Sequence, residues 1–213
     1  HLFEEAVQAG VTIEKIFALE SYRDQLAAFP QTVWVSEDIL LDLADSQTPQ
    51  GIVAVVQKEE VGQVDFSQGK FLFLEDVQDP GNVGTIIRTA DAAGFTGVIV
   101  SNKSADIYSL KTLRSMQGSH FHLPIYRMSS QALLKETKEA AVPVLATTLS
   151  KDSVDYRELP SIENFVLVMG NEGQGISPLM AESADQLVHI SMKGQAESLN
   201  VAVAAGILIF HLS

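Results

Sequence analysis

Three polar, glycine-rich segments hold the residues of this sequence whose types and spacing could do chemistry: DPGNVGTIIR (79–88), MGNEGQGIS (169–177) and KGQAESLN (193–200). Glycine lets a main chain approach a ligand closely, and the amide, carboxylate and guanidinium groups between the glycines can orient a hydroxyl or hold an anion. Taken one at a time, each segment is also explained by a turn that needs flexible residues. An isolated arginine such as Arg88, six residues after Asn82, is by itself more often solvated or salt-bridged than catalytic.

The residue types also exclude several kinds of chemistry. None of the three segments has the G-x-G-x-x-G spacing or the GK[ST] ending of a Walker loop, so nicotinamide enzymes and nucleoside-triphosphate enzymes are not supported. The chain has no cysteine, which removes thiolate nucleophiles, thiolate metal sites and disulfides. We expect no metal.

The third segment lies inside a longer stretch, His189–Phe210, that reads as a short strand, a polar loop and an apolar helix. The helix from Val201 to Phe210 lacks the polar face of a surface helix, so we expect it to be covered by a sheet or by another subunit. Its first turn would hold Ser198 and Asn200 beside main-chain N–H groups that have no partner within the helix.

The elements that position these segments alternate regularly from Lys70 onward. Apolar strands are predicted at 71–77, 97–101, 121–126, 143–148, 165–170 and 186–191, and helices at 85–95, 109–118, 131–141, 177–184 and 201–210. Continuous apolar strands that alternate with helices predict a parallel sheet covered on both faces. Ligands bind such sheets at the carboxyl ends of the strands, where the three segments lie.

The front of the chain predicts a separate small α/β unit over residues 1–56, followed by a polar linker at 57–69. Helices are expected at 2–10 and 37–46, with Ser36 as a possible cap of the second, and strands at 15–20, 32–36 and within 48–57. The chain begins with His1 rather than Met and opens inside a helix-like piece, so we expect it to lack its natural start.

Charge gives a divided indication about partners. The net charge of −13 argues against a nucleic-acid partner. Residues 88–127, however, carry five basic side chains (Arg88, Lys103, Lys111, Arg114 and Arg127) against two acidic ones. This strip is compatible with RNA and also with ordinary surface scatter. No apolar run approaches the roughly 18 residues of a membrane span and no secretory signal is visible, so we expect a soluble, cytoplasmic protein.

The combination of the three segments, in this order, resembles the SpoU (TrmH) family of RNA ribose 2′-O-methyltransferases of the SPOUT class. The resemblance covers about residues 70–211. The first motif is matched by Asn82, Gly84, Arg88, Ala90 and Gly94-Phe95, the second by Gly170, Asn171, Glu172, Gly173, Gly175 and Ser177, and the third by Ile190, Ser198, Leu199, Asn200 and Val201. One departure is Gln117, where the family more often has a small residue before the glycine.

The resemblance implies a parallel-sheet SPOUT domain at 70–213 with a C-terminal trefoil knot, preceded by a truncated L30e-like RNA-binding domain at 1–56. It implies S-adenosylmethionine as cofactor, bound mainly by main-chain groups at Gly170, Ile190 and Leu199, with Thr147, Met169, Asn171 and Gly175 as neighbours. Apolar side chains would line the walls of that pocket.

The resemblance also assigns catalytic roles. Arg88 is the matching catalytic residue. A guanidinium is a poor base, and we expect it to grip an RNA phosphate beside the target ribose. Asn82 and Asn200 would orient the ribose or Arg88, Glu172 would pair with Arg88 or position its own loop, and Ser198 would order the third loop.

The expected substrate is a structured RNA, most favourably 23S ribosomal RNA, contacted by Lys103, Lys111 and Arg114, and the expected assembly is a homodimer. The alternatives are a transfer RNA 2′-O-methyltransferase and a non-catalytic RNA-binding relative. A dead relative would be expected to lose Arg88, Asn200 or the 171–173 trio, and all of these are present.

Overall fold

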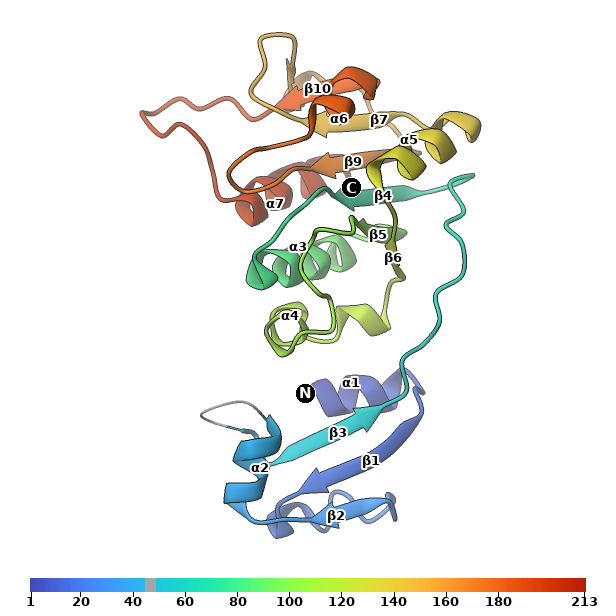
Figure 1. Cartoon of the computed structure of the whole chain (residues 1–213), viewed down its shortest axis with the longest axis vertical. Helices are drawn as coiled ribbons and strands as arrows, with labels where there is room; N and C mark the ends of the chain where they lie inside the picture. The colour runs from blue at the N-terminus through green and yellow to red at the C-terminus, as the bar shows by residue number, and fades with distance from the viewer. Residues whose placement is uncertain (45–48) are drawn as a thin grey trace. The chain divides into compact units, whose positions relative to one another are not determined.

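The computed structural model describes residues 1–44 and 49–213 (Figure 1). The chain divides into two compact units, His1–Glu60 and Val61–Ser213. The last two residues of the helix expected at 37–46, and the first of the turn and strand expected at 48–57, lie outside the described residues. Within the described ranges, no helix combines the length and the apolar character that crossing a bilayer requires.

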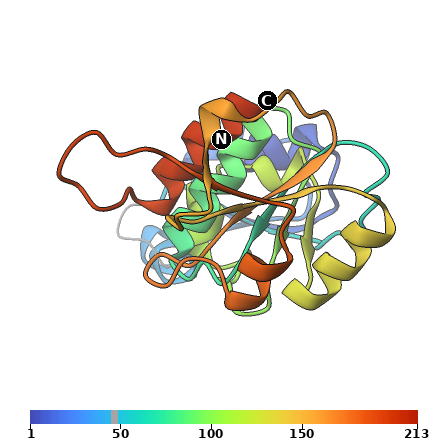
Figure 2. The same cartoon turned by 90° about the horizontal axis from the view of Figure 1, so that it is seen from above.

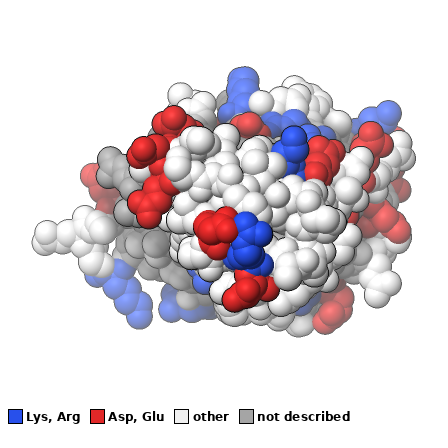
Figure 3. Space-filling view, turned by 90° about the horizontal axis from the view of Figure 1, so that it is seen from below, with Lys and Arg blue, Asp and Glu red and all other residues white. Residues whose placement is uncertain are grey.

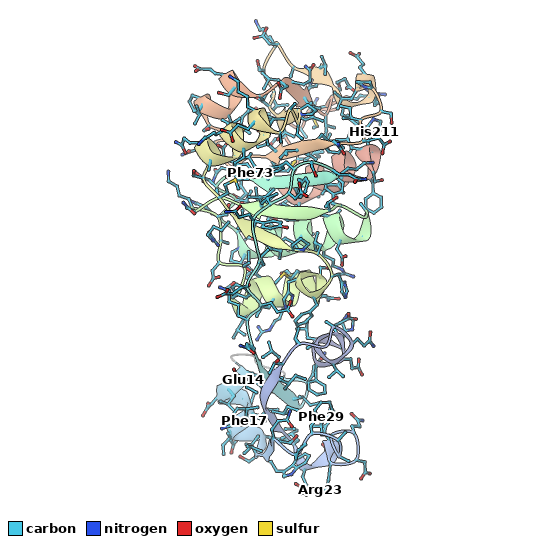
Figure 4. The ribbon with its side chains drawn as sticks, turned by 90° about the vertical axis from the view of Figure 1, so that its right-hand side faces the viewer. Glu14, Phe17, Arg23, Phe29, Phe73 and His211 are labelled. Carbon is cyan, nitrogen blue, oxygen red and sulfur yellow. The ribbon has the colours of Figure 1, made fainter. Side chains whose placement is uncertain are left out.

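The small unit is a three-stranded mixed sheet with two short helices. Its elements are α1 (Leu2–Gln8), β1 (Ile13–Ala18), a 3-10 turn (Glu20–Tyr22), β2 (Thr32–Trp34), α2 (Glu37–Ala44) and β3 (Ile52–Val56). The strand order is β2-β1-β3, with β1 parallel to β2 and antiparallel to β3. Ile16, Ala18 and Leu26 form the buried core, and Phe29 (labelled in Figure 4) meets Phe3 edge-on at 5.3 Å. Acidic and basic groups are interspersed on the face shown in Figure 3.

The large unit is built on a seven-stranded sheet of order β6-β5-β4-β9-β7-β10-β8, with every pairing parallel. The strands are β4 (Lys70–Leu74), β5 (Gly97–Val100), β6 (Ile125–Arg127), β7 (Val144–Thr147), β8 (Val154–Asp155), β9 (Phe165–Met169) and β10 (Gln186–His189). The helices are α3 (Pro80–Ala92), α4 (Leu110–Met116), α5 (Ser130–Glu139), α6 (Pro178–Ser183) and α7 (Val201–Leu212). The predicted parallel α/β fold is confirmed.

Helices cover both faces of this sheet, because alternate side chains of each strand enter different cores. Leu72 and Leu74 of β4 pack in one cluster with side chains of α3, α4 and α7. Phe71 and Phe73 of the same strand pack in a second cluster with α5 and α6. Figure 2 shows α3 and α7 on one side of the strands and α5 and α6 on the other.

Three predicted elements differ in detail from the structure. The helix expected at 85–95 begins at Pro80, because the Asp79 carboxylate caps it and Pro80 suits the first helical position. The strand expected at 121–126 begins as a 3-10 turn, Ser119–Phe121, because Gly118 adopts a left-handed φ of 96° and turns the chain; pairing with β5 starts only at Ile125. The irregular stretch between 148 and 164 contains the two-residue strand β8 and a 3-10 turn, Tyr156–Glu158. A strand of two residues is too short to show a periodicity.

Helix α3 lies against α4 at a contact that only glycine permits. A Cβ at Gly84 would stand 2.5 Å from Ser115 Cβ, 2.7 Å from the Thr112 carbonyl oxygen and 2.9 Å from Met116 N. Real Cβ atoms do not approach so closely, and two of these neighbours are main-chain atoms that cannot yield alone. Gly84 therefore fixes the position of α3, which carries Asn82 and Arg88.

Among the described residues, the side chains that cover helix α7 lie on one side of it. Ala205, Leu208 and Ile209 are buried against the sheet, whereas the side chains of Val203 and Phe210 are 53% and 58% exposed. From the sequence we expect a sheet or another subunit to cover this helix. The sheet of this chain buries one side of it and leaves Val203 and Phe210 exposed. In the segment 57–69, which has no helix or strand, Phe66 is buried edge-on against Phe71 at 5.2 Å.

Candidate active site at the carboxyl edge of the sheet

The three polar segments follow the carboxyl ends of β4, β9 and β10, and β4 and β9 are neighbours in the sheet. The first and second segments therefore meet directly. Residues 76–79 lead from β4 into α3, and residues 170–177 lead from β9 into α6. Residues 190–199 lead from β10 into α7 as a long, mostly exposed loop, drawn in red in Figure 2.

The start of α3 is capped by its own sequence. The Asp79 carboxylate accepts a hydrogen bond from Asn82 N at 2.9 Å, and Pro80 occupies the first helical position. Lys111 of α4 donates to the other oxygen of Asp79 at 3.0 Å. The bond from Lys111, followed by that from Asn82 N, lowers the pKa of Asp79. The cap therefore stays ionised where Asp usually titrates.

Glu172 of the second segment binds the first segment through three donors. Its carboxylate accepts from Gln78 N at 3.1 Å, Asp79 N at 3.0 Å and Asn82 Nδ2 at 3.2 Å. Burial raises the pKa of Glu172, but the main-chain bonds from Asp79 and Gln78 outweigh it and the net pKa is lowered. These bonds come from amide groups of the first segment, and none of them comes from Arg88.

The second segment is itself a tight turn. Asn171 and Gly175 exchange two main-chain hydrogen bonds of 3.0 and 2.9 Å, and the Asn171 side chain donates to the Asp76 carbonyl at 2.8 Å. A Cβ at Gly170 would lie 2.3 Å from the carbonyl carbon of Gly175. Gly170 is therefore required by the main chain that folds back over it.

Asn200 joins the third segment to the other two. Its Oδ1 accepts from Ala202 N at 2.8 Å and Val203 N at 3.3 Å, which caps α7. Its Nδ2 donates to Asn82 Oδ1 at 3.1 Å. The structure therefore links three predicted residues, Asn200, Asn82 and Glu172, in one hydrogen-bonded chain.

The first segment is also held from the side of β5 by residues that the sequence did not single out. Asp76 has a left-handed φ of 57°, and its carboxylate accepts from Ser101 Oγ at 2.6 Å while its N–H donates back at 2.8 Å. Ser104 accepts from Val77 N at 3.2 Å and donates to the Leu74 carbonyl at 3.0 Å. A signal was available, because two acidic residues, Glu75 and Asp76, interrupt the apolar strand predicted at 71–77.

A second polar group, also missed from the sequence, fixes the start of the third segment. Ser191 donates to the Asp155 carboxylate, which also binds Arg157 through two bonds of 2.6 and 2.9 Å. The bonds from Arg157 and Ser191 hold the pKa of Asp155 well below its usual range. His189 lies between the hydroxyls of Ser153, at 3.0 Å, and Ser191, at 3.3 Å. Ile190 is thus bracketed by anchored residues.

Arg88 and Ser198 are exposed and lie outside this hydrogen-bonded chain. Arg88 is on α3, six residues after Asn82, which lies in the first turn of that helix. None of the ion pairs among the described residues includes Arg88. Its guanidinium is therefore available to an anion that arrives from solvent.

The residues predicted to hold a cofactor lie around the same edge. Met169 is buried, Ile190 is half-buried, and the Leu199 side chain is 36% exposed. The Thr147 hydroxyl donates to the Val168 carbonyl at 2.9 Å and is committed to the sheet. Among the described residues, no main-chain hydrogen bond involves residues 191–199, so donors and acceptors of this loop are open to a ligand.

The predicted RNA contacts are exposed cations near the first segment. The side chains of Lys103 and Lys111 are 80% and 63% exposed, and their ammonium groups lie 3.9 Å from Asp76 and 3.0 Å from Asp79. Arg114 is exposed one turn after Lys111 on α4. Acidic partners thus offset part of the charge of both lysines.

Comparison with known proteins places both units. The SpoU rRNA methylase family matches residues 69–210, and the RNA 2′-O ribose methyltransferase substrate-binding family matches residues 1–61. The 23S rRNA (guanosine(2553)-2′-O)-methyltransferase RlmP of Bacillus subtilis is 41% identical over 214 residues, which covers 100% of this chain and 85% of that protein.

Solved structures agree with these matches. An AdoMet-bound rRNA methyltransferase from Sinorhizobium meliloti superposes with a TM-score of 0.87 at 34% identity, over 99% of this chain and 83% of that one. The SpoU methyltransferase AviRb from Streptomyces viridochromogenes, in complex with AdoMet, gives 0.84 at 29% identity, over 99% and 86%. The chain therefore belongs to the SpoU rRNA methylase family of RNA 2′-O-ribose methyltransferases.

Proposed function

We propose that this protein transfers a methyl group from S-adenosylmethionine to a ribose 2′-hydroxyl of 23S ribosomal RNA. The observation that carries the proposal is the hydrogen-bonded chain Asn200–Asn82–Glu172, which gathers one residue from each family motif at the carboxyl edge of the sheet. The full-length relative RlmP acts on 23S rRNA, which favours ribosomal RNA over the transfer RNA alternative. The presence of Arg88, Asn200 and the 171–173 trio argues against a non-catalytic relative.

The residues at this edge fit the cofactor. Adenine needs donors and acceptors at its edge, and the 191–199 loop has main-chain groups that no described main-chain group satisfies. Ile190 and Leu199 offer partly exposed apolar side chains as walls of the pocket. In this proposal, the neighbouring contacts come from Thr147 and from the main chain of Met169, Gly170, Asn171 and Gly175. When bound, S-adenosylmethionine supplies an electrophilic methyl group.

Catalysis in this proposal comes from placement. Arg88 binds an RNA phosphate beside the target ribose through its two-pronged donor geometry, and its positive charge favours loss of the hydroxyl proton to solvent water. Asn82, held by Glu172 and Asn200, orients the ribose, and Ser198 orders the loop that approaches it. Alignment of this kind can supply about 7–11 kcal/mol of the rate gain.

RNA binding in this proposal combines Lys103, Lys111 and Arg114 of the large unit with the small unit, residues 1–56, as an L30e-like substrate-binding domain joined by the segment 57–69. Structured RNA is recognised largely by shape and by phosphate contacts, which suits a few cations on an otherwise acidic chain. An enzyme of ribosomal RNA works where ribosomes are assembled, and we assign it to the cytoplasm.

We also propose a homodimer and a trefoil knot in the C-terminal part of the large unit. The exposed Val203 and Phe210 on α7 support the dimer, because apolar side chains of this size on one helix are stabilised by a covering surface. In this proposal, the apolar helix α7, which follows the long 190–199 loop, is the segment that passes through the knot, as the family resemblance implies.

The test is the variant Arg88→Ala. We expect methylation of 23S rRNA to be lost while calorimetric titration gives nearly unchanged affinity for S-adenosylmethionine. The matched control is Lys135→Ala, which removes an exposed cation from α5, on the other face of the sheet, and should keep full activity. Full methylation by Arg88→Ala would remove the assigned role, and absence of cofactor binding to the unaltered protein would remove the proposed function.

The RNA target is tested separately. Ribose methylation is mapped across ribosomal and transfer RNA from cells with and without this protein. A single 2′-O-methyl group that disappears from 23S rRNA is expected, whereas a loss confined to transfer RNA would move the substrate to the alternative class.

A further inference from the structure

Glu75 is a buried carboxylate to which the mechanism above gives no role. It directly follows β4 and is 3% exposed, and none of the ion pairs among the described residues includes it. Burial of a carboxylate is unfavourable unless hydrogen bonds compensate. The partners of Glu75 therefore indicate what it is kept for.

Those partners lie at both ends of the second glycine segment. The main-chain N–H of Glu75 donates to the Met169 carbonyl at 2.9 Å, where the segment begins. Its carboxylate accepts from Ser177 N at 2.8 Å and from Ser177 Oγ at 2.8 Å, where the segment ends. Glu75 is thus hydrogen-bonded to the residue before the turn 170–176 and to the residue after it. A third bond, from Ser130 Oγ at 2.6 Å, ties the carboxylate to the start of α5.

The bond to the Ser177 hydroxyl also sets the direction of that hydroxyl. Ser177 Oγ accepts from Met180 N at 3.1 Å as the cap of α6. A hydroxyl has one hydrogen and two acceptor lone pairs. Because its hydrogen is directed to Glu75, a lone pair is left for Met180 N. The carboxylate therefore orients the end of the segment as well as holding it.

We propose that Glu75 is a positioning residue for cofactor binding: through Ser177 it fixes the turn 170–176 in the shape that presents the Gly170 main chain to S-adenosylmethionine. This inference rests on the proposed function, which assigns the cofactor to that turn. Glu75 acts on the cofactor only through the segment it holds. Loss of the Glu75 carboxylate should therefore weaken binding of the cofactor and of its demethylated product alike, since both share the adenosine and amino-acid parts.

The experiment measures calorimetric Kd values for S-adenosylmethionine and S-adenosylhomocysteine on the full-length chain. Glu75→Gln keeps the side-chain shape but replaces the charged carboxylate by a neutral amide, so the bonds to Ser177 lose their charge assistance. Binding of both ligands should therefore weaken by about tenfold or more. The matched control Ser130→Ala removes the bond that leads to α5 and should leave both Kd values unchanged.

A mutant cycle then tests whether Ser177 transmits the effect. Ser177→Ala should raise the Kd of both ligands, and Ser177→Thr should keep the Kd values near those of the unaltered protein because it keeps the hydroxyl. In the Ser177→Ala background, Glu75→Gln should not raise the Kd values further. If Glu75→Gln does not fold, the Ser177 pair and Ser130→Ala decide the question.

Three results would overturn the inference: full affinity in Glu75→Gln, full affinity in Ser177→Ala, or a loss limited to S-adenosylmethionine. The last would mean that Glu75 acts through its charge on the sulfonium. The proposed function fails separately, when the unaltered protein binds neither ligand.

Discussion

Replacing glycine by alanine should change the free energy of unfolding in opposite directions at Gly84, where α3 meets α4, and at Gly206 on α7. Gly84→Ala would place a Cβ at 2.5–2.9 Å from three atoms, two of them main-chain atoms of α4. Overpacking of this kind costs about 1–3 kcal/mol, against a gain of about 1 kcal/mol from replacing a helical glycine by alanine. Because all three distances are below any real contact, we take the upper part of that range and expect a net loss of about 2 kcal/mol in the free energy of unfolding.

Gly206→Ala is the matched control on the helix that packs on the other side of α3. There a Cβ would meet only Thr89 Cγ2, at 4.0 Å, an ordinary contact, so the gain in helix propensity of about 0.5–1 kcal/mol is kept. Thermal unfolding followed by circular dichroism should lower the Tm of Gly84→Ala by about 4–8 °C and raise that of Gly206→Ala by about 1–4 °C.

The same change should affect catalysis at the first position only. To relieve the overlap, α3 must move away from α4, and it carries Asn82 and Arg88 with it. A displacement well below 1 Å slows a reaction whose rate depends on alignment. We therefore expect kcat to fall by about tenfold in Gly84→Ala and to be retained in Gly206→Ala. Equal Tm values for the two variants, or a stabilised Gly84→Ala, would refute the packing argument.

Three further predictions concern single side chains. Glu172→Gln leaves one of the main-chain N–H groups of Gln78 and Asp79 without an acceptor, so kcat/KM for RNA methylation should fall by about tenfold or more; activity equal to wild type would contradict the role of Glu172 in holding the first segment. Burial, and then the charge of His122, lower the pKa of His120 to about 4 from 6.5. Since the unfolded chain then binds the additional proton below pH 6.5, the free energy of unfolding should fall between about pH 6.5 and 4 by at most about 3 kcal/mol and should not respond above that window. Urea unfolding of His120→Phe should lack this slope, and an unchanged slope would assign it to other groups. Gln117 caps α4 in the left-handed region, at φ 49°, so Gln117→Gly should raise the unfolding free energy by about 1 kcal/mol, measured as Cm in urea; destabilisation would show that its side chain makes a compensating contact.

Most elements of the large unit could be predicted because its central strands, such as β4, β5 and β9, are continuous apolar runs. Ser177 with Pro178 marks a helix start that the structure confirms, whereas Asp79 with Pro80 begins α3 five residues before the predicted start at 85. Strand β8 escaped prediction because two residues carry no period. The order of the sheet could not be read either, since strands that pair, such as β4 and β9, are far apart in the chain.

The site was predicted in part. The resemblance to the SpoU family pointed to Asn82, Glu172 and Asn200, which the structure links. It could not say that Glu172 binds main-chain amides, because such bonds depend on how two loops approach each other. Glu75 lies inside the strand predicted at 71–77, and the strand pattern does not reveal its hydrogen-bond partners. Only the fold shows that it is buried. The assignment of individual cofactor contacts stays a prediction.

The bond between Asn82 and Asn200 spans 118 residues, and this has a consequence for protein synthesis. Strand β4 emerges early but lies at the centre of the sheet, and one of its edges is filled only by β9, almost 100 residues later. Until then the nascent chain carries an apolar strand with an open edge, the kind of surface that associates with other unfolded chains. The hydrogen-bonded chain of the site closes later still, once α7 has left the ribosome. In the proposed function, methylation of any RNA, including that of the ribosome that made the molecule, therefore has to wait until α7 has been released and has docked.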